Sequence, residues 1–360
     1  MPSPTASAPR AQARAWRRVH VAMAWLLLGA ALVLLMAASL TAGPIPVSLA
    51  DAYGALAAPD ADRLADLLVW SDRLPRTVVA MAAGASLAVA GALMQAFTRN
   101  PMASPGLFGI NAGALFALAL CSLAGPDLSA LLPFAPVQAQ QAAIACIGAA
   151  AAGALVLALG HAGASRGAGT PFDVTRMVLA GAAVTALFGA LTQAMLVTRE
   201  ETLDNILAWM AGSVAGRPLQ PLAPLFALMA LASCGAWLMA RHIDVLMTGD
   251  GTATGLGLRT RWLRAAMALA VVALAGAAVA MVGNVGFIGL VVPHVARGLV
   301  GARHARLLPA CAVLGALLLL AADVLVRQLA QPEEMPVGAV TAAIGTPVFF
   351  YLLARGWRRG

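Results

Sequence analysis

The chain has 360 residues, of which 61% are hydrophobic and 11% are charged, whereas soluble globular domains have about 45–50% apolar and about 25% charged residues. This composition excludes an ordinary water-soluble domain and indicates a protein solvated mainly by lipid. All 23 basic residues are arginine, and a Walker A phosphate loop requires lysine, so the sequence contains no ATP site of that type. The net charge of +8 does not indicate nucleic-acid binding, because the arginines lie between apolar runs and form no basic stripe.

Ten apolar runs approach the length of about 20 residues that a membrane-spanning helix needs. In chain order they cover residues 20–41, 77–97, 107–125, 139–160, 177–197, 221–240, 265–282, 284–300, 308–326 and 337–354. The first run is longer than the about 7–15 apolar residues of a signal peptide, so we expect it to remain as a span. The sequence therefore predicts an all-α polytopic membrane protein with ten transmembrane helices. We expect residues 1–19 to form a cytoplasmic tail and residues 20–360 a single transmembrane domain.

The distribution of charge predicts the orientation. Ten spans place both chain ends on one side of the membrane. With both ends in the cytoplasm, most of the 23 arginines fall in inner segments, whereas only three of the 15 acidic residues do: Asp173, Asp244 and Asp250. Arginine-rich loops remain on the cytoplasmic side during insertion, so we expect cytoplasmic termini.

Two arginines stand on the side that this rule leaves poor in arginine. Arg73 and Arg76 flank Pro75 at the outer mouth of the second run. Proline suits the first turn of a helix, but arginine there opposes the helix dipole. One interpretation is anchoring to lipid phosphates, and the other is a docking site for an anionic partner.

The second run and the loop after it predict close helix packing and a tight inner turn. Gly84, Ala88, Gly91 and Ala92 place small residues on one helix face, where a neighbouring helix can approach closely. The prolines of TRNPMASPG then stop the helix at the inner surface.

A run of glycines predicts a short or broken helix near the eighth span. Gly283, Gly286 and Gly289 recur every three residues, and Pro293 follows. Non-helical backbone at membrane depth persists only where it is buried in protein or lines a wet cavity. His294 beside it is either a hydrogen-bonded structural residue or a proton relay.

Three further features leave alternatives open. Asp323 is the only acid well inside a run, and Arg327 lies four residues later on the same helix face, so they form either a structural ion pair or a functional one.

Residues 204–216 are too short to span and form either a re-entrant helix at an entry vestibule or a surface helix. Residues 245–265 form a long, glycine-rich inner loop, which is either a connector or a place where a cytoplasmic partner acts.

Together these segments resemble the permease subunits of ABC importers for ferric siderophores, haem and cobalamin. In order, from about residue 70 to the C-terminus, the resemblance rests on RLPRTVVA, AGALMQAFTRNPMASPGLFGINAGA, VLAGAAV, WMAGSVAGR, GFIGLVVPHVARGLVGARHARLLPACAVLGALLLLAADVLVR and MPVGAVTAAIGTPVFFYLLAR. It implies ten helices per subunit and a homo- or heterodimer with the pathway at its centre. It also implies two ATPase subunits below, a periplasmic binding protein above, and a location in the bacterial inner membrane.

The resemblance also implies roles for particular residues. Outer arginines of this family meet glutamates on the binding protein, and the matching residues here are Arg73, Arg76 and Arg327. The family's cytoplasmic gate includes the residues around an N-P-L element and a loop before the fifth helix, and the matching residues are Asn100, Met102 and Thr175. Methionine replaces the usual leucine at this gate.

The element that couples the family's permeases to the ATPase reads roughly G-D-E-x-A-x-x-L-G. The matching residues here are Gly249, Asp250, Ala253, Leu256 and Gly257, with glycine in place of the glutamate at position 251. An extra glycine weakens a short helix by roughly 1 kcal/mol, so we expect a normal docking place on a softer loop.

The resemblance implies a permease that carries ferric siderophore, with no catalytic residue, cofactor, metal site or nucleic-acid partner of its own. Haem and cobalamin import by the same family are the alternatives. A secondary transporter driven by protons or sodium is the rival of another class. It normally needs acidic residues, or broken helices with polar ligands, near mid-membrane, and Asp323 alone, near one end of its run, is poor support for it. An intramembrane enzyme would need a nucleophile with a base or a metal cluster in the spans, and the five isolated histidines supply neither.

Overall fold

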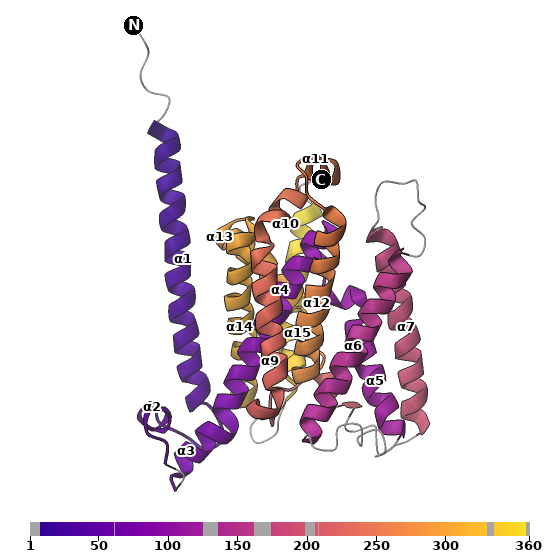
Figure 1. Ribbon diagram of the computed structural model, residues 1–360. Helices are drawn as coiled ribbons and strands as arrows, with labels where there is room; N and C mark the ends of the chain where they lie inside the picture. The colour runs from indigo at the N-terminus through magenta and orange to yellow at the C-terminus, as the bar shows by residue number, and fades with distance from the viewer. Residues whose placement is uncertain are drawn as a thin grey trace.

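The computed structural model describes residues 8–60, 62–124, 136–161, 174–198, 206–207, 209–329 and 335–357, and in these ranges it contains helices and no strand. Each apolar run forms a helix (Figure 1): α1 (Ala8–Thr41), α4 (Leu74–Thr98), α5 (Ile110–Ala124), α6 (Val137–His161), α7 (Val174–Thr198), α9 (Leu219–Leu238), α12 (Thr260–Val282), α13 (Ile288–Val300), α14 (His304–Leu329) and α15 (Val337–Trp357). By length and hydropathy, 7 candidate spans stand out, and α5, α13 and α15 contribute shorter apolar helices. The prediction of an all-α membrane protein with ten such helices, some of them short, is confirmed.

Helix α4 forms the centre of the bundle and is buried along most of its length against α12, α13 and α14. A Cβ atom added to Gly91 would lie 1.9 Å from the carbonyl oxygen of Gly289 in α13, and one added to Gly84 would lie 2.2 Å from that of Gly315 in α14. The close approach of neighbouring helices predicted for this glycine-rich face is therefore confirmed. Glycine is required there because any side chain would push the backbones apart.

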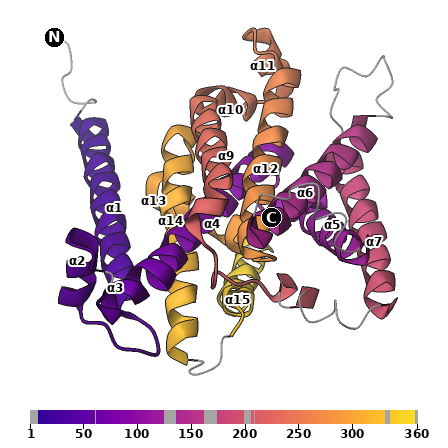
Figure 2. The same cartoon turned by 60° about the horizontal axis from the view of Figure 1, so that its bottom comes forward.

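Helices α5, α6 and α7 pack against one another beside this centre, and α6 joins them to α12. Figure 2 places the three on the opposite side of the bundle from α1. Gly113 and Gly148 let α5 and α6 touch, since a Cβ on either would lie within 2.4 Å of an alanine Cβ of the other helix.

The predicted interruption of the eighth span is present. Helix α13 begins at Ile288, so it is shorter than the predicted run 284–300. The backbone between α12 and α13 turns through positive φ angles at Gly283 (75°) and Phe287 (65°). The carbonyl of Val282 accepts a hydrogen bond from the backbone N–H of Ser213, which satisfies a polar group at the broken end.

The segment that supplies this hydrogen bond packs against the break between α12 and α13 and against the start of α15. Residues 209–211 are helical, and Val214 is fully buried. A Cβ on Gly283 would lie 2.2 Å from the carbonyl oxygen of Trp209, and one on Gly338, at the start of α15, would lie 2.4 Å from that of Ala211. Leu207 and Met210 of the same segment remain exposed, so both alternatives for residues 204–216 stay open.

Short helices mark the two ends of the bundle (Figure 1). At one end are α2 (Leu49–Ala57), α3 (Leu64–Leu68) and the π-helical turn η1 (Val69–Arg73). At the other are α10 (Ala240–Leu246) and α11 (Asp250–Gly255), and the first residues of α1 and the last residues of α15 lie on this side in Figure 1. The first end corresponds to the predicted outer side, and the second to the predicted cytoplasmic side.

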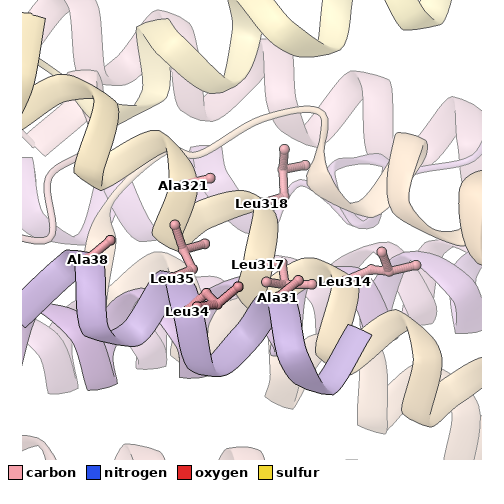
Figure 3. Close-up of a pocket in the computed structure, with 8 residues that line it drawn as sticks. All are labelled: Ala31, Leu34, Leu35, Ala38, Leu314, Leu317, Leu318 and Ala321. Atoms are coloured by element: carbon pink, nitrogen blue, oxygen red, sulfur yellow. The ribbon is translucent and has the colours of Figure 1, made fainter. Parts of the chain in front are cut away.

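Helix α1 stands at the edge of the bundle, and only 6% of the 18-residue apolar stretch within Val19–Thr41 is buried. Between α1 and α14 lies an apolar groove of about 570 Å³ (Figure 3), lined by Ala31, Leu34, Leu35, Ala38, Leu314, Leu317, Leu318 and Ala321. Apolar side chains at a membrane-exposed edge suit lipid acyl chains. Helix α1 begins at Ala8, so part of the predicted tail 1–19 is helical, and residues 1–7 lie outside the described residues.

Candidate functional site: a buried arginine cluster and a cytoplasmic joint

Two of the three predicted docking residues, Arg76 and Arg327, bind one carboxylate at the predicted outer end of α4 and α14. Arg76 Nη2 lies 2.9 Å from Asp323 Oδ1, and Arg327 Nη2 lies 2.7 Å from Asp323 Oδ2. Asp323 has an exposed fraction of 0%, and Arg76 and Arg327 have fractions of 5% and 8%. The pairing of Asp323 with Arg327 expected from their spacing is confirmed. We call Arg73, Arg76, Asp323 and Arg327 the outer arginine cluster.

Arg73 completes this cluster by holding the end of α1. Its guanidinium donates to the carbonyls of Leu40 at 2.8 Å and Thr41 at 2.9 Å, and also to that of Ile45. Arg73 is placed by η1, whose wider π-helical turn directly precedes α4, and such turns are frequent at functional sites.

Arg327 and Ser39 join the same helices. Arg327 donates to the Ser39 carbonyl at 2.9 Å and to Ser39 Oγ at 2.6 Å, and Ser39 Oγ lies 2.7 Å from Thr77 Oγ1. The cluster therefore connects α1, α4 and α14. Each guanidinium already contacts groups of this chain. A partner above the cluster would therefore be attracted by the charge of the guanidiniums and would not bind freely exposed arginine side chains. Arg76 and Arg327 share the carboxylate of Asp323, whereas Arg73 donates to backbone carbonyls at the end of α1.

At the opposite end, α4 is followed by residues 99–104, which we call the gate turn after the role that the resemblance implies for Asn100 and Met102, and by the short helix η2 (Pro105–Phe108). Arg99 ends α4 in the left-handed conformation, with φ 52° and ψ 27°. Asn100 is exposed, and its Oδ1 accepts from the backbone N–H of Met102 at 2.9 Å. Thr175 lies exposed in the first turn of α7, which packs against η2.

The predicted coupling residues form α11 and its flanks. Gly249 precedes the helix with φ 119°, and Gly257 follows it with φ 81°. Ala253 is fully buried, whereas Leu256 is 70% exposed. One face of α11 therefore rests on the protein, and an apolar side chain at its end faces outwards.

Asp250, the first residue of α11, forms ion pairs with two arginines from other elements. Its Oδ1 lies 2.7 Å from Arg99 Nη2 and 2.9 Å from Arg264 Nη2. Burial acts to raise the pKa of Asp250, but hydrogen bonds and charge from Arg264, and those from Arg99, outweigh burial and hold the pKa below its ordinary 3.8. We call Arg99, Asp250 and Arg264 the Asp250 joint.

The same end contains two polar contacts that sequence reasoning missed. Asp244 Oδ1 in α10 accepts from the backbone N–H of His304 at 3.0 Å and lies 2.6 Å from His304 Nδ1. Arg297 donates to Gln95 Oε1 at 2.6 Å. Neither these contacts nor the Asp250 joint has a sequence signal, because helix packing alone brings the partners together. In the described part of the chain, no group of three or more His, Cys, Asp or Glu side chains could hold a metal ion.

Comparison with known proteins gives this architecture a context. The chain is 45% identical over 292 residues, covering 81% of it and 83% of the relative, to YfiZ of Bacillus subtilis, a permease protein named for siderophore transport. It is 39% identical over 338 residues, covering 93% of it and 98% of the relative, to the Fe(3+) dicitrate transport system permease protein FecC of Escherichia coli. It is 38% identical over 293 residues, covering 80% of it and 83% of the relative, to the hemin transport system permease protein HmuU of Yersinia pestis.

The fold is also similar to a solved structure described as an inward-facing conformation of a metal-chelate type ABC transporter. The two match with a TM-score of 0.78 and 26% sequence identity, over 92% of this chain and 98% of the other. The sequence model of the FecCD transport family matches residues 12–355. A match over nearly the whole chain, together with these relatives, shows that the protein belongs to the FecCD transport family and is a membrane permease of the iron-chelate ABC type.

Proposed function

We propose that this chain is the permease subunit of an ATP-driven importer that moves ferric siderophore across the bacterial inner membrane. The proposal rests on two features that occur together: the chain matches the FecCD family over ten apolar helices, and a short helix, α11, lies beyond the spans. The sequence contains no lysine and hence no Walker A loop, so ATP is hydrolysed on a separate subunit. Two such subunits serve a dimer of permeases, whose cytoplasmic gate includes Asn100, Met102 and Thr175.

The surface around α11 suits a protein partner. Leu256, Trp262 and Met247 expose 70%, 71% and 43% of their surface at this end. Leu256 and Met247 lie outside the candidate spans, and Trp262 lies in the first turn of α12. Exposed apolar side chains beyond the lipid favour a protein interface, so we assign this surface to the ATPase.

The contacts of Asp323, a buried acid in the candidate span His304–Leu329, argue against an ion-coupled carrier. A proton- or sodium-coupled site needs an acidic group that is free to change its partner. Asp323 is fixed between Arg76 and Arg327 by contacts of 2.9 and 2.7 Å. Among the described residues, this carboxylate therefore serves the structure rather than an ion pathway.

We assign docking of the periplasmic binding protein to the outer arginine cluster, because guanidinium groups attract the carboxylates of a partner. Two substitutions at Arg73 separate charge from structure. Arg73→Lys keeps the charge and Arg73→Gln removes it, while both lose the guanidinium contacts with Leu40 and Thr41.

Each variant of the chain is reconstituted in nanodiscs, and its affinity for the purified binding protein is measured. The melting temperature of each variant serves as the folding control. We expect Arg73→Lys to bind as wild type does and Arg73→Gln to bind roughly two- to five-fold more weakly, the range of a screened charge pair. Equal binding by both variants would refute docking by charge.

The substrate is tested by uptake of radioactive iron into cells that lack this gene and into cells that carry it again. Iron is supplied as ferric siderophore, ferric citrate or hemin. We expect siderophore uptake to depend on the gene. Dependence of hemin uptake alone would favour the haem alternative, which the relative HmuU supports.

A further inference from the structure

The cytoplasmic end of the molecule contains a hinge next to α11. Gly249, with φ 119°, separates α10 from α11 and adopts a backbone conformation that favours glycine. Helix α10 is held on the other side by Asp244, which binds the backbone and the ring of His304 at the start of α14. Helix α11 can therefore turn about Gly249 while α10 stays attached to the bundle.

Arg99 bridges this hinge. Its Nη2 donates to the carbonyl of Leu246 in α10 at 3.0 Å and to Asp250 Oδ1 in α11 at 2.7 Å. The backbone of Arg99 is in the left-handed region, which L residues rarely adopt, and the next residue is Asn100 of the proposed gate. A change in the angle between α10 and α11 must therefore stretch one of these two contacts or move the gate turn.

Arg264 provides the fixed point of the arrangement. Its side chain is 7% exposed, and it contacts Asp250 Oδ1 at 2.9 Å and Oδ2 at 3.1 Å. Its guanidinium also lies 5.8 Å from the centre of the Phe97 ring in α4. Asp250 is the only carboxylate that contacts Arg264 within the described ranges. A buried guanidinium whose charge is compensated by a single carboxylate binds that carboxylate firmly, because losing it would leave a buried charge without a partner.

We propose that Asp250 is a positioning residue that transmits movement of α11 to the cytoplasmic gate by holding Arg99, with Arg264 as its anchor on α12. This inference rests on the proposed function, because it assumes that a partner displaces α11. This role of Asp250 lies within the chain and is distinct from contact with the ATPase. Asp250 makes α11 and the gate turn move as one body.

The test follows the distance between α11 and the gate turn by double electron–electron resonance. Spin labels are attached at Thr254→Cys and Pro101→Cys, both exposed positions, in the full chain with its four native cysteines replaced and reconstituted in nanodiscs. In the otherwise unchanged chain we expect a narrow distance distribution that remains narrow when the ATPase is added.

Three variants then probe the joint. Asp250→Asn should broaden the distribution about twofold, because Arg99 keeps one of its two contacts, and Asp250→Glu should restore the narrow distribution. Arg99→Gln should broaden it as Asp250→Asn does. Arg99→Gln leaves the Asp250–Arg264 pair in place, and its own side chain is 36% exposed, so this variant keeps the test valid if Asp250→Asn fails to fold. Thr252→Ala, on the exposed surface of α11, is the matched control.

A distribution in Arg99→Gln as narrow as that of the parent chain, or broadening in Thr252→Ala, would overturn the proposal. Failure of the ATPase to bind the parent chain would refute the proposed function instead. The label distances in the chain alone would still decide whether the joint holds α11 to the gate turn.

Discussion

Asp323 pairs with two arginines at the predicted outer end of the protein. It lies buried between Arg76 and Arg327, whose side chains are 6% and 5% exposed. Breaking a buried ion pair costs about 3–5 kcal/mol, because the remaining charge is left without a partner. We predict that Asp323→Asn lowers the free energy of unfolding by about this amount, measured by thermal unfolding in detergent.

The matched control for Asp323 is the exposed ion pair of Asp51 with Arg63, whose side chains are 41% and 50% exposed. Exposed pairs contribute about 0–1 kcal/mol, so Asp51→Asn should change the melting temperature little. Equal effects of the two substitutions would mean that the outer arginine cluster does not stabilise the fold.

Gly91 tests the packing of α4 at the same scale. A Cβ there would overlap the backbone of Gly289, whereas one on Gly235 in α9 would meet nothing within 4 Å. We predict that Gly91→Ala destabilises the protein by at least about 3 kcal/mol, the upper range for overpacking, because a backbone cannot yield as a side chain can. Gly235→Ala should be neutral or slightly stabilising, and thermal unfolding that ranks the two in the opposite order would contradict the observed packing.

The pH dependence of the Asp250 joint follows from the sign of its pKa shift. Because the pKa of Asp250 in the folded protein is held below 3.8, its contribution to stability is present above the unfolded pKa and is lost as the pH falls through the lower folded value. The difference in melting temperature between wild type and Asp250→Asn should therefore stay constant from about pH 5 to pH 8. A difference that decreases within this window would show that the carboxylate is not held in its charged form.

At the scale of elements, the glycines of α11 leave this helix weakly specified. A Cβ on Gly251 would meet no atom within 4 Å, and the φ of Gly251 is not positive, so alanine fits there and favours the helix by about 0.5–1 kcal/mol. We predict stronger hydrogen-exchange protection of α11 in Gly251→Ala than in wild type. Gly257→Ala is the contrasting variant, because Gly257 has φ 81°, and it should lose protection.

The sequence predicted the elements well where a single physical cause determines them. Length and hydropathy located the ten long apolar helices, and the glycine run at 283–289 predicted the break before α13. The i, i+4 spacing of Asp323 and Arg327 predicted their ion pair. Each of these signals lies within one helix or one loop.

Contacts between distant segments could not be predicted in this way. The sequence placed Arg73 and Arg76 at the outer mouth of a span, but it gave no sign that the carbonyls of α1 and the carboxylate of α14 would cover their guanidiniums. In the same way, Arg99 and Asp250 meet only because α4 and α10 end side by side. Such pairs depend on packing, which a single sequence does not encode locally.

At the scale of the whole molecule, polar clusters mark the two ends of an apolar bundle. The outer arginine cluster ties α1 to α4 and α14, and the Asp250 joint ties α11 to α4 and α12. Helix α4 takes part in both. A displacement at α11 therefore acts on the same central helix that carries Arg76 of the outer arginine cluster, which suits alternating access in a transporter.

The central claim is that this permease conducts its substrate but is driven by ATP hydrolysed elsewhere. The most direct measurement is uptake of radioactive ferric siderophore into proteoliposomes that contain the purified chain, with and without its ATPase and binding protein. We predict uptake only when both partners and ATP are present. Accumulation of siderophore by the chain alone, against a gradient and without ATP, would contradict the account.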